Sequence, residues 1–311
     1  MSEYNFTKEG PDPLTPNQQK LMDKTHSIWH KAKNFIKRYF KWVIIILIGV
    51  SLANYVSETF IAPSSEFSDS SLFDDEITDE DCSVVGIEIH GSVLTYVPDH
   101  ADGDSFFNYD VTSSENVIAT IRSANEDENV KAILIEVDSA GGSPVGGEEI
   151  ANALRNSEKP TVAMIREMGT SAAYLAASGA DYIFASKNSD VGSIGVTMSY
   201  LDNTGKNKKD GYTFEQLSAG KYKDYGNPDK PLTSEERALI QNDLDTIHKN
   251  FIAYVAENRN LPIADVQKIA TGASFLGEKA KALGLIDEIG GIFEVEKYLE
   301  EKIGEKPEIC W

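Results

Sequence analysis

Residues 131–155, KAILIEVDSAGGSPVGGEEIANALR, contain the pattern that decides the fold. Lys131 to Val137 is almost continuously apolar, which is typical of a strand covered on both faces. A glycine-containing turn follows, and residues 148–155 have helical spacing with Ile150 and Leu154 on the inner side. A buried strand that passes through a short turn into a helix predicts a β-α unit of a parallel sheet.

Comparable units lie on both sides of this stretch. Ser114 is expected to cap a helix, and Thr233 to Glu236 form a capping box that opens a long helix with an apolar side running from Leu239 to Val255. The sequence therefore predicts an α/β fold of repeated β-α units with a C-terminal helical segment. The other expected elements are strands at 84–90, 161–165 and 182–185 and helices at 171–178, near 263–270, near 277–283 and from about 293.

An uncharged run, WVIIILIGVSLANYVS, occupies residues 42–57. Its length of about 24 Å is short of the ~30 Å hydrocarbon core, so the span is expected to reach residue 62. Basic residues lie just before it and none closely follows, which keeps the N-terminus in the cytoplasm. A buried core helix and a cleaved signal peptide are the alternatives. The 41 residues ahead of the run and the acidic tract behind it favour an uncleaved signal anchor.

These features divide the chain into four segments. We expect a basic cytoplasmic segment at 1–41, a single transmembrane helix at 42–62, an acidic, serine-rich linker at 63–81 and a folded domain at 82–311. The expected location is the inner (plasma) membrane, with the folded domain outside the cytoplasm, in the periplasm if the cell has two membranes.

The charge and the cysteine content exclude some classes of function. The net charge is −21, and residues 1–41 carry eight basic and four acidic groups, so the acidity lies in the remainder. An acidic domain repels phosphate backbones, which argues against a nucleic-acid partner. Two cysteines, Cys82 and Cys310, are too few for a disulfide scaffold or a zinc cluster. Whether they pair or stay as thiols is left open by the sequence.

The residues suited to catalysis lie in three loops that join strands to helices, at 138–147, 166–172 and 190–195, and in a fourth loop at 218–228 that contains a lysine. The glycines of DSAGG at 138–142 can turn backbone amides toward an oxyanion, and Ser171 begins a helix of small residues, although either feature could be a simple turn or cap. A serine nucleophile needs a base. The exported part has His90, His100 and His248 in no motif-like setting, so a lysine that is desolvated enough to lose its proton is the other option.

Five segments in order resemble one family. They are DSAGG at 138–142, GTSAAYLAASGADYI at 169–183, VGSIGV at 191–196, GKYKDYGNP at 220–228 and SFLGEKAKALGLIDEIGG at 274–291. In this order and with these gaps the chain resembles the signal peptide peptidase A family, peptidase family S49, whose members have a ClpP/crotonase-like fold and a Ser-Lys dyad.

The resemblance assigns roles to residues of this chain. It implies Ser171 as nucleophile, Lys223 as general base, Ser193 as the residue that holds the lysine, and the amides of Gly142 and Ala172 as oxyanion donors. It implies no metal or other cofactor, hydrophobic peptide substrates such as cleaved signal peptides, and a homo-oligomer. Asp181 matches the family's aspartate.

The chain also departs from the family's pattern. Ala140 stands where the family has proline, Gly169-Thr170 replace Ala-Ala before the nucleophile, and Ala172-Ala173 replace Gly-Gly after it. These changes keep open an inactive or weakly active, membrane-tethered scaffold. A second alternative is a crotonase-like acyl-CoA enzyme, which would share the fold and the glycine loop but would need neither Ser171 nor Lys223.

Overall fold

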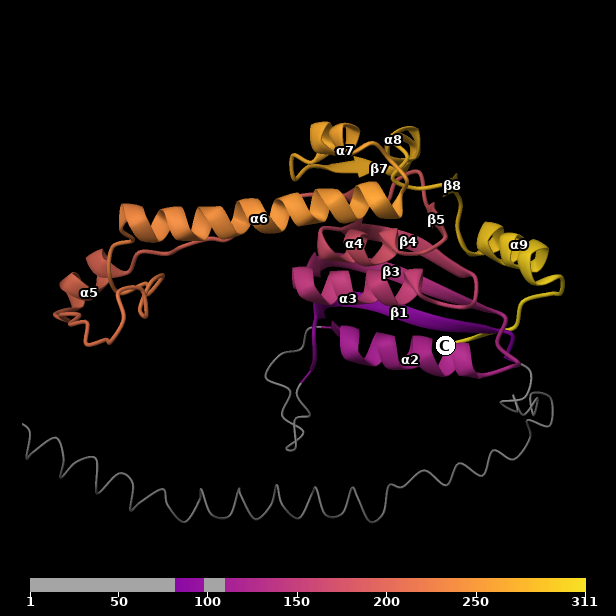
Figure 1. Cartoon of the computed structure of the whole chain (residues 1–311), viewed down its shortest axis with the longest axis horizontal. Helices are drawn as coiled ribbons and strands as arrows, with labels where there is room; N and C mark the ends of the chain where they lie inside the picture. Colours follow the sequence, from indigo (N-terminus) through magenta and orange to yellow (C-terminus); the bar gives the residue numbers. More distant parts are fainter. Residues whose placement is uncertain (1–81, 98–109) are drawn as a thin grey trace, which may run out of the picture. The chain divides into compact units, whose positions relative to one another are not determined.

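The computed structural model describes residues 82–97 and 110–311 (Figure 1). Its strands are β1 (Val84–Leu94), β2 (Val111–Ser113), β3 (Ala132–Gly142), β4 (Thr161–Thr170), β5 (Tyr182–Ala185), β6 (Asp190–Gly192), β7 (Ser274–Leu276), β8 (Glu288–Ile289) and β9 (Ile309–Cys310). Its helices are α2 (Ser114–Glu126), α3 (Pro144–Arg155), α4 (Ala172–Ser178), α5 (Thr204–Asp210), α6 (Ser234–Asn258), α7 (Ile263–Ile269), α8 (Gly277–Ala282) and α9 (Ile292–Ile303).

The strands form one sheet in the order β2-β1-β3-β4-β5-β8, and every neighbouring pair along this path is parallel. β6 continues from the end of β4 and pairs with β7, which is antiparallel to it. Parallel neighbours need crossover connections, and α2, α3 and α4 supply them along one side of the sheet (Figure 1). The predicted α/β class is confirmed.

Side-chain alternation along the strands divides the core into two layers. Ile133 and Ile135 of β3 lie in the larger cluster with side chains of α2, α3, α4 and α6. Leu134, one residue out of phase, lies in the smaller cluster with Val295 and Leu299 of α9. Because successive strand residues point to opposite faces, a continuous apolar strand requires cover on both sides, as the sequence predicted.

Helix caps explain where the elements start. The predicted capping box at Thr233 and Glu236 is confirmed, since each side chain bonds the other residue's backbone amide. The predicted cap at Ser114 is wrong by one residue. Ser113 accepts from the Asn116 amide, and the Ser114 hydroxyl instead donates to Glu149 of α3, 2.5 Å away.

Only the last third of α6 packs on the core. Phe251, Ile252, Val255 and Ala256 are buried, whereas Leu239 near the other end is 37% exposed. The expected apolar side of α6 is thus only partly covered within one chain. We call residues 198–250 the arm; it contains α5, the loop before α6 and the uncovered part of α6 (Figure 1).

Within the residues that the structure describes, no helix has the length and apolar character needed to cross a bilayer. The predicted membrane anchor at 42–62, the segment at 1–41 and the linker at 63–81 lie outside these residues.

A disulfide joins the two ends of the described chain. Cys82 and Cys310 are bonded with their Cα atoms 5.9 Å apart, which answers the question that the sequence left open. β9 pairs with the start of β1, and Trp311 packs its ring on Gly86, where a Cβ would come within 2.5 Å of it. The bond therefore fastens a strand of two residues to the sheet.

Removal of this disulfide should destabilise the fold. The bridge joins residues 228 positions apart, and cross-links of that span lower the entropy of the unfolded chain enough to contribute about 3–5 kcal/mol. We expect the Cys82→Ser/Cys310→Ser protein to lose that much free energy of unfolding in urea titrations. Reductant should lower the wild-type value equally and leave the double variant unchanged. Equal stabilities of the two proteins without reductant would contradict this.

Candidate active site

Ser171 lies on a sharp turn between a strand and a helix. β4 ends at Thr170 and α4 begins at Ala172, and the Ser171 backbone between them has φ 55° and ψ −127°. Its amide donates to the Gly192 carbonyl at 2.8 Å and its carbonyl accepts from Leu175 at 3.0 Å. Hydrogen bonds at both the amide and the carbonyl of Ser171 therefore fix the backbone of the turn.

The hydroxyl of Ser171 does not cap helix α4. Ser171 occupies the N-cap position of α4, but its side chain makes no capping hydrogen bond. The residue is partly exposed, whereas Ala172 and Ala173 behind it are buried. Positive φ at a non-glycine residue costs of order 1–3 kcal/mol, and such strain gathers at active sites. A strained strand-to-helix turn is also the geometry that presents a serine nucleophile in hydrolases of another fold.

The predicted glycine loop lies directly against this turn. Gly141 has φ +107°, and a Cβ on it would lie 2.8 Å from Ser171 Cβ and 2.9 Å from the Ala172 amide nitrogen. The Ser139 hydroxyl fixes the loop by donating to the Gly91 carbonyl at 2.6 Å and accepting from the Gly141 amide at 3.1 Å. Only a residue without a side chain allows this approach. Gly141 is the glycine of the pair that sequence reasoning did not single out.

Gly142, the expected oxyanion donor, lies one residue further along. Its backbone is in register with Val93 of β1, and a Cβ would come within 2.1 Å of the Val93 carbonyl oxygen. The other expected donor, the amide of Ala172, is in the first turn of α4, where amides have no acceptor within the helix. The structure thus brings Gly142 and Ala172 to the same edge of the sheet as Ser171, and their role as donors stays a prediction.

Ser193 lies beside the turn at Ser171 and directly follows β6. β6 pairs with the end of β4, with Thr170 opposite Gly192, so Ser193 directly follows the residue whose carbonyl holds the Ser171 amide. Its backbone also has positive φ, 51°, and its hydroxyl donates to the Gly272 carbonyl at 2.9 Å. The expected proximity to Ser171 is present, while the contact to a lysine is not made among the described residues of this chain.

Asp181 matches a family position but has a structural role here. Its carboxylate accepts from the backbone amide and from the hydroxyl of Thr161, at 2.9 and 3.0 Å. These bonds tie the start of β5 to the start of β4, at the opposite end of the strands from Ser171.

Lys223 is not beside Ser171 in one chain. It lies in a turn of the arm, close to the outer end of α6, and it is exposed. Ser234, which begins α6, is 17 residues before the first core contact at Phe251, or about 25 Å along the helix axis. Figure 1 shows α4 near the inner end of α6 and α5 near the outer end. The fold therefore separates the two residues of the predicted dyad.

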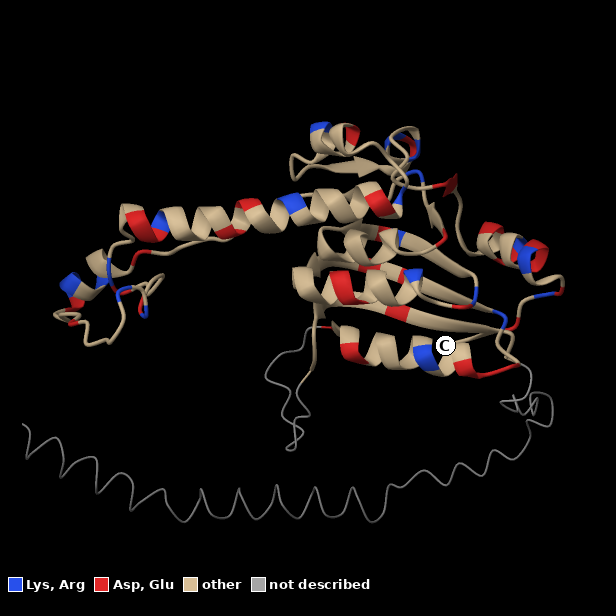
Figure 2. Cartoon of the chain, in the orientation of Figure 1, with Lys and Arg blue, Asp and Glu red and all other residues tan. Residues whose placement is uncertain are grey.

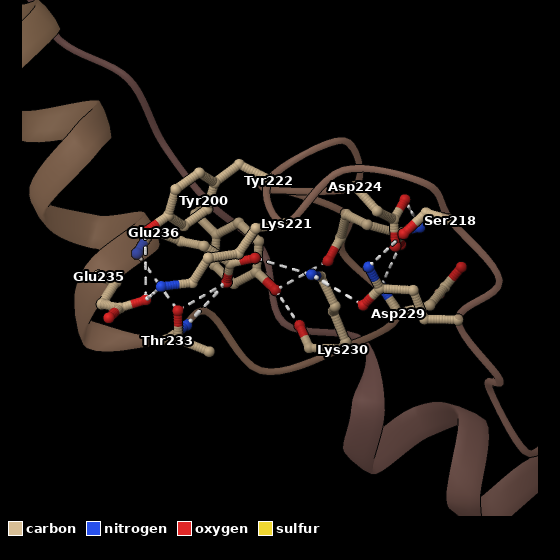
Figure 3. A network of polar contacts seen from close by, with 12 residues as sticks. Tyr200, Ser218, Lys221, Tyr222, Asp224, Asp229, Lys230, Thr233, Glu235 and Glu236 are labelled. Carbon is tan, nitrogen blue, oxygen red and sulfur yellow. Dashed lines mark hydrogen bonds and ion pairs between the residues drawn. The ribbon is translucent and has the colours of Figure 1, made fainter.

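A network of polar contacts orders the loop around Lys223 (Figure 3). Lys221 forms an ion pair with Glu235 at 2.6 Å, and Tyr222 donates to the same carboxylate at 3.2 Å. Lys230 pairs with the buried Glu236 at 2.7 Å. These bonds fasten the loop to the start of α6, so the lysines are presented on an ordered turn.

The two lysines of the loop differ in their surroundings. The hydrogen bond to Glu235 raises the pKa of Lys221, which keeps that amine charged. Among residues 82–97 and 110–311, the Nζ of Lys223 has no hydrogen-bond or ion-pair partner. Of the two, Lys223 is the amine that remains available to a reaction partner.

The histidines that the structure describes do not replace the lysine. The His90 ring lies 3.3 Å from the Glu136 carboxylate and 3.9 Å from that of Glu88. His248 is on α6, and its buried Nε2 has no partner in the described part of the chain. Neither ring bonds to Ser171. His100 lies outside the described residues.

A parallel α/β sheet that presents a serine on a strained turn beside a glycine loop resembles the arrangement found in serine hydrolases. Comparison with known proteins gives the family. The model of peptidase family S49 matches residues 153–305. The chain belongs to this family, the signal peptide peptidase A family.

Individual proteins similar to this chain are consistent with this family assignment. A putative protease of Methanocaldococcus jannaschii is 37% identical over 205 residues, which cover 65% of this chain and 66% of that protein. A putative signal peptide peptidase of Enterococcus faecium is 27% identical and covers 80% and 72%. Protease 4 of Haemophilus influenzae is 28% identical over 71% of this chain, and the match spans 35% of its own length. The chain thus spans about two thirds of the shorter relatives and about a third of the longer one.

One solved structure is a ClpP1 mutant of Listeria monocytogenes, with 14% identity and a TM-score of 0.44 over 67% of this chain and 92% of that one. At this level of similarity the ClpP/crotonase-like assignment remains what the family resemblance implies.

The backbone strain at Ser171 can be measured. Glycine adopts positive φ without the steric cost that a Cβ imposes, so Ser171→Gly should be about 1 kcal/mol more stable than Ser171→Ala, although glycine usually destabilises. Urea unfolding of the two variants checks this. Ser178→Gly against Ser178→Ala, inside α4 where φ is helical, is the matched control and should show the opposite order. The same order at both positions would contradict the strain.

Proposed function

We propose that this protein is a membrane-anchored serine peptidase that cleaves hydrophobic peptides, such as cleaved signal peptides, with Ser171 as nucleophile and the Lys223 of a neighbouring copy as general base. The observation that carries the proposal is the turn at Ser171, which is partly exposed, makes no capping bond and packs beside the glycine loop.

The reaction follows from the groups at the turn. Neutral Lys223 takes the proton of Ser171 while the hydroxyl oxygen attacks the peptide carbonyl. The amides of Gly142 and Ala172 stabilise the oxyanion, and loss of one such donor typically slows the reaction about 10²–10³-fold. Lys223 then protonates the leaving amine, and water hydrolyses the ester. These steps need no metal or cofactor.

Ser193 fits the role of holding the lysine. Its hydroxyl uses its proton on the Gly272 carbonyl, and its oxygen still has lone pairs that can accept from an amine. This gives a positioning residue at the nucleophile turn that can receive a lysine from elsewhere.

The arm supports a dyad formed between copies. Within one chain the lysine loop is fastened to the outer end of α6, remote from the core contact of that helix. An exposed lysine is protonated at neutral pH and cannot act as a base until it is buried. Contact with a neighbouring copy would provide both the burial and the nucleophile.

Two observations support a location outside the cytoplasm. The disulfide between Cys82 and Cys310 is of a kind that persists in oxidising compartments. The basic flank before residue 42 favours a cytoplasmic N-terminus and export of the residues after the anchor. We therefore place the peptidase domain on the outer side of the inner (plasma) membrane.

Mixed oligomers test the dyad. Ser171→Ala and Lys223→Ala should each lower the hydrolysis of a hydrophobic fluorogenic peptide at least about 10³-fold. When the two variants are co-expressed, a site regains both groups only where an intact Ser171 meets an intact Lys223 from the next copy, so about a quarter of wild-type activity should return. Lys279→Ala, which removes an exposed lysine of α8 away from the loop, is the control and should keep most of the activity.

Other outcomes would overturn parts of the proposal. If both single variants are inactive and their co-expression restores no activity, Ser171 and Lys223 act within one chain. Full activity of both single variants would refute the dyad. A wild-type protein that cleaves no peptide and reacts with no acyl probe would favour a tethered scaffold.

A further inference from the structure

The most deeply buried residue of the arm is a carboxylate. Of residues 198–250, all of which the structure describes, only Glu236 is buried, with 4% of its surface exposed. A glutamate is rarely buried unless its charge is paired, and no apolar side chain of the arm is buried beside this one. The order of the arm therefore depends on what this carboxylate binds.

Both oxygens of Glu236 have partners. Oε2 accepts from the backbone amide and from the hydroxyl of Thr233, each at 3.0 Å, as part of the capping box that opens α6. Oε1 lies 2.7 Å from Nζ of Lys230, whose side chain is 17% exposed. The hydrogen bond from Lys230 lowers the pKa of the Glu236 carboxyl, so this carboxylate is charged at neutral pH. It joins the start of α6 to the loop before the helix.

Further hydrogen bonds lead from Lys230 to the turn at Lys223 (Figure 3). The hydroxyl of Tyr200 donates to the carbonyl of Lys230 and to that of Asn227, the latter at 3.1 Å. The side-chain amide of Asn227 donates in turn to the carboxylate of Asp224 at 3.1 Å. Asp224 directly follows Lys223 in the chain. The buried pair is therefore linked to the lysine turn through Tyr200, Asn227 and Asp224.

A second ion pair lies in the same region, where Figure 2 shows acidic and basic positions close together at the outer end of α6. Lys221 and Glu235 are 65% and 63% exposed, and water screens an exposed pair so that it usually contributes little. Removal of one partner of a buried pair is more disruptive, because the other charge is left uncompensated. Of the two pairs, we expect that of Glu236 with Lys230 to determine where the loop lies.

We propose that Glu236 is a positioning residue for catalysis, which acts through Lys230 to hold the turn at Lys223 where the lysine amine meets Ser171. This inference rests on the proposed function, in which Lys223 is the general base. A displacement of about 1 Å at a reacting group can slow an enzyme about 10²-fold, and the loop has no buried apolar side chain that would limit such a displacement. Glu236 itself transfers no proton.

Kinetics of the full-length protein in mild detergent test the inference, with a hydrophobic fluorogenic peptide as substrate. Glu236→Gln keeps the length of the side chain and its ability to cap α6, and it removes the charge. We expect kcat to fall at least about 10-fold while KM stays within about 2-fold, because the lysine turn and not the peptide site is altered. Lys230→Met should give the same loss, and Lys230→Arg, which keeps the pair, should retain most of the activity.

A double variant separates positioning from a general loss of structure. The Lys223→Ala protein has no amine left to position, so the addition of Glu236→Gln should lower its residual rate less than about 2-fold. An activated ester as substrate keeps this residual rate measurable, because its leaving group needs no proton. Glu278→Gln is the matched control, because it makes the same change at an exposed ion pair between α8 and Lys187, and its kcat should be unchanged.

The inference is wrong if Glu236→Gln and Lys230→Met both keep the wild-type kcat, and the dyad would then stand without it. An equal loss of rate with and without Lys223 would assign the buried pair a purely structural role, as would a rise in KM alone. Full activity of Lys223→Ala would instead refute the proposed function, and with it the reason to position this lysine.

Discussion

The close approach of Gly141 to the backbone at Ser171 and Ala172 is the constraint on which the site depends. A Cβ at position 141 would overlap with both the Ser171 side chain and the first amide of α4. The approach is possible because β3 and β4 are parallel neighbours, so that their carboxyl ends, with the loops that follow, meet at one edge of the sheet. The glycine loop, the turn at Ser171 and Ser193 after β6 come together because all of them lie at this edge of the sheet.

The strained backbone of Ser171 is maintained by the rigid structure around it. A non-glycine residue keeps a positive φ only where neighbouring bonds determine the backbone, and here the Gly192 carbonyl, the first turn of α4 and the glycine loop do so. Behind the turn, α4 consists mostly of small residues that are almost completely buried between β4, α3 and α6. Small side chains let these backbones come close, which explains why the helix that carries the serine has so little bulk.

The arm is a different kind of element from the core. Its order comes from local polar bonds such as Lys230 with Glu236 and from the capping box of α6, while its apolar residues remain uncovered. Most helical stability in proteins comes from tertiary packing, and in α6 only the last third, with Phe251 and Val255, packs on the core. The arm therefore presents apolar side chains, such as Leu201 and Leu217, that the described part of its own chain leaves exposed.

The sequence by itself determined the α/β class, most helices and strands, the capping box at Thr233 and the position of Ser171 at a helix start, because these depend on local periodicity and capping chemistry. It misplaced one cap, because Ser113 and Ser114 are equally good cap residues and only the contact of Ser114 with Glu149 distinguishes them. Tertiary structure alone decided that Cys82 meets Cys310, that Gly141 rather than Gly142 touches Ser171, and that Lys223 is remote from Ser171 within one chain. Each of these depends on distances between segments far apart along the chain, which spacing in a sequence does not contain.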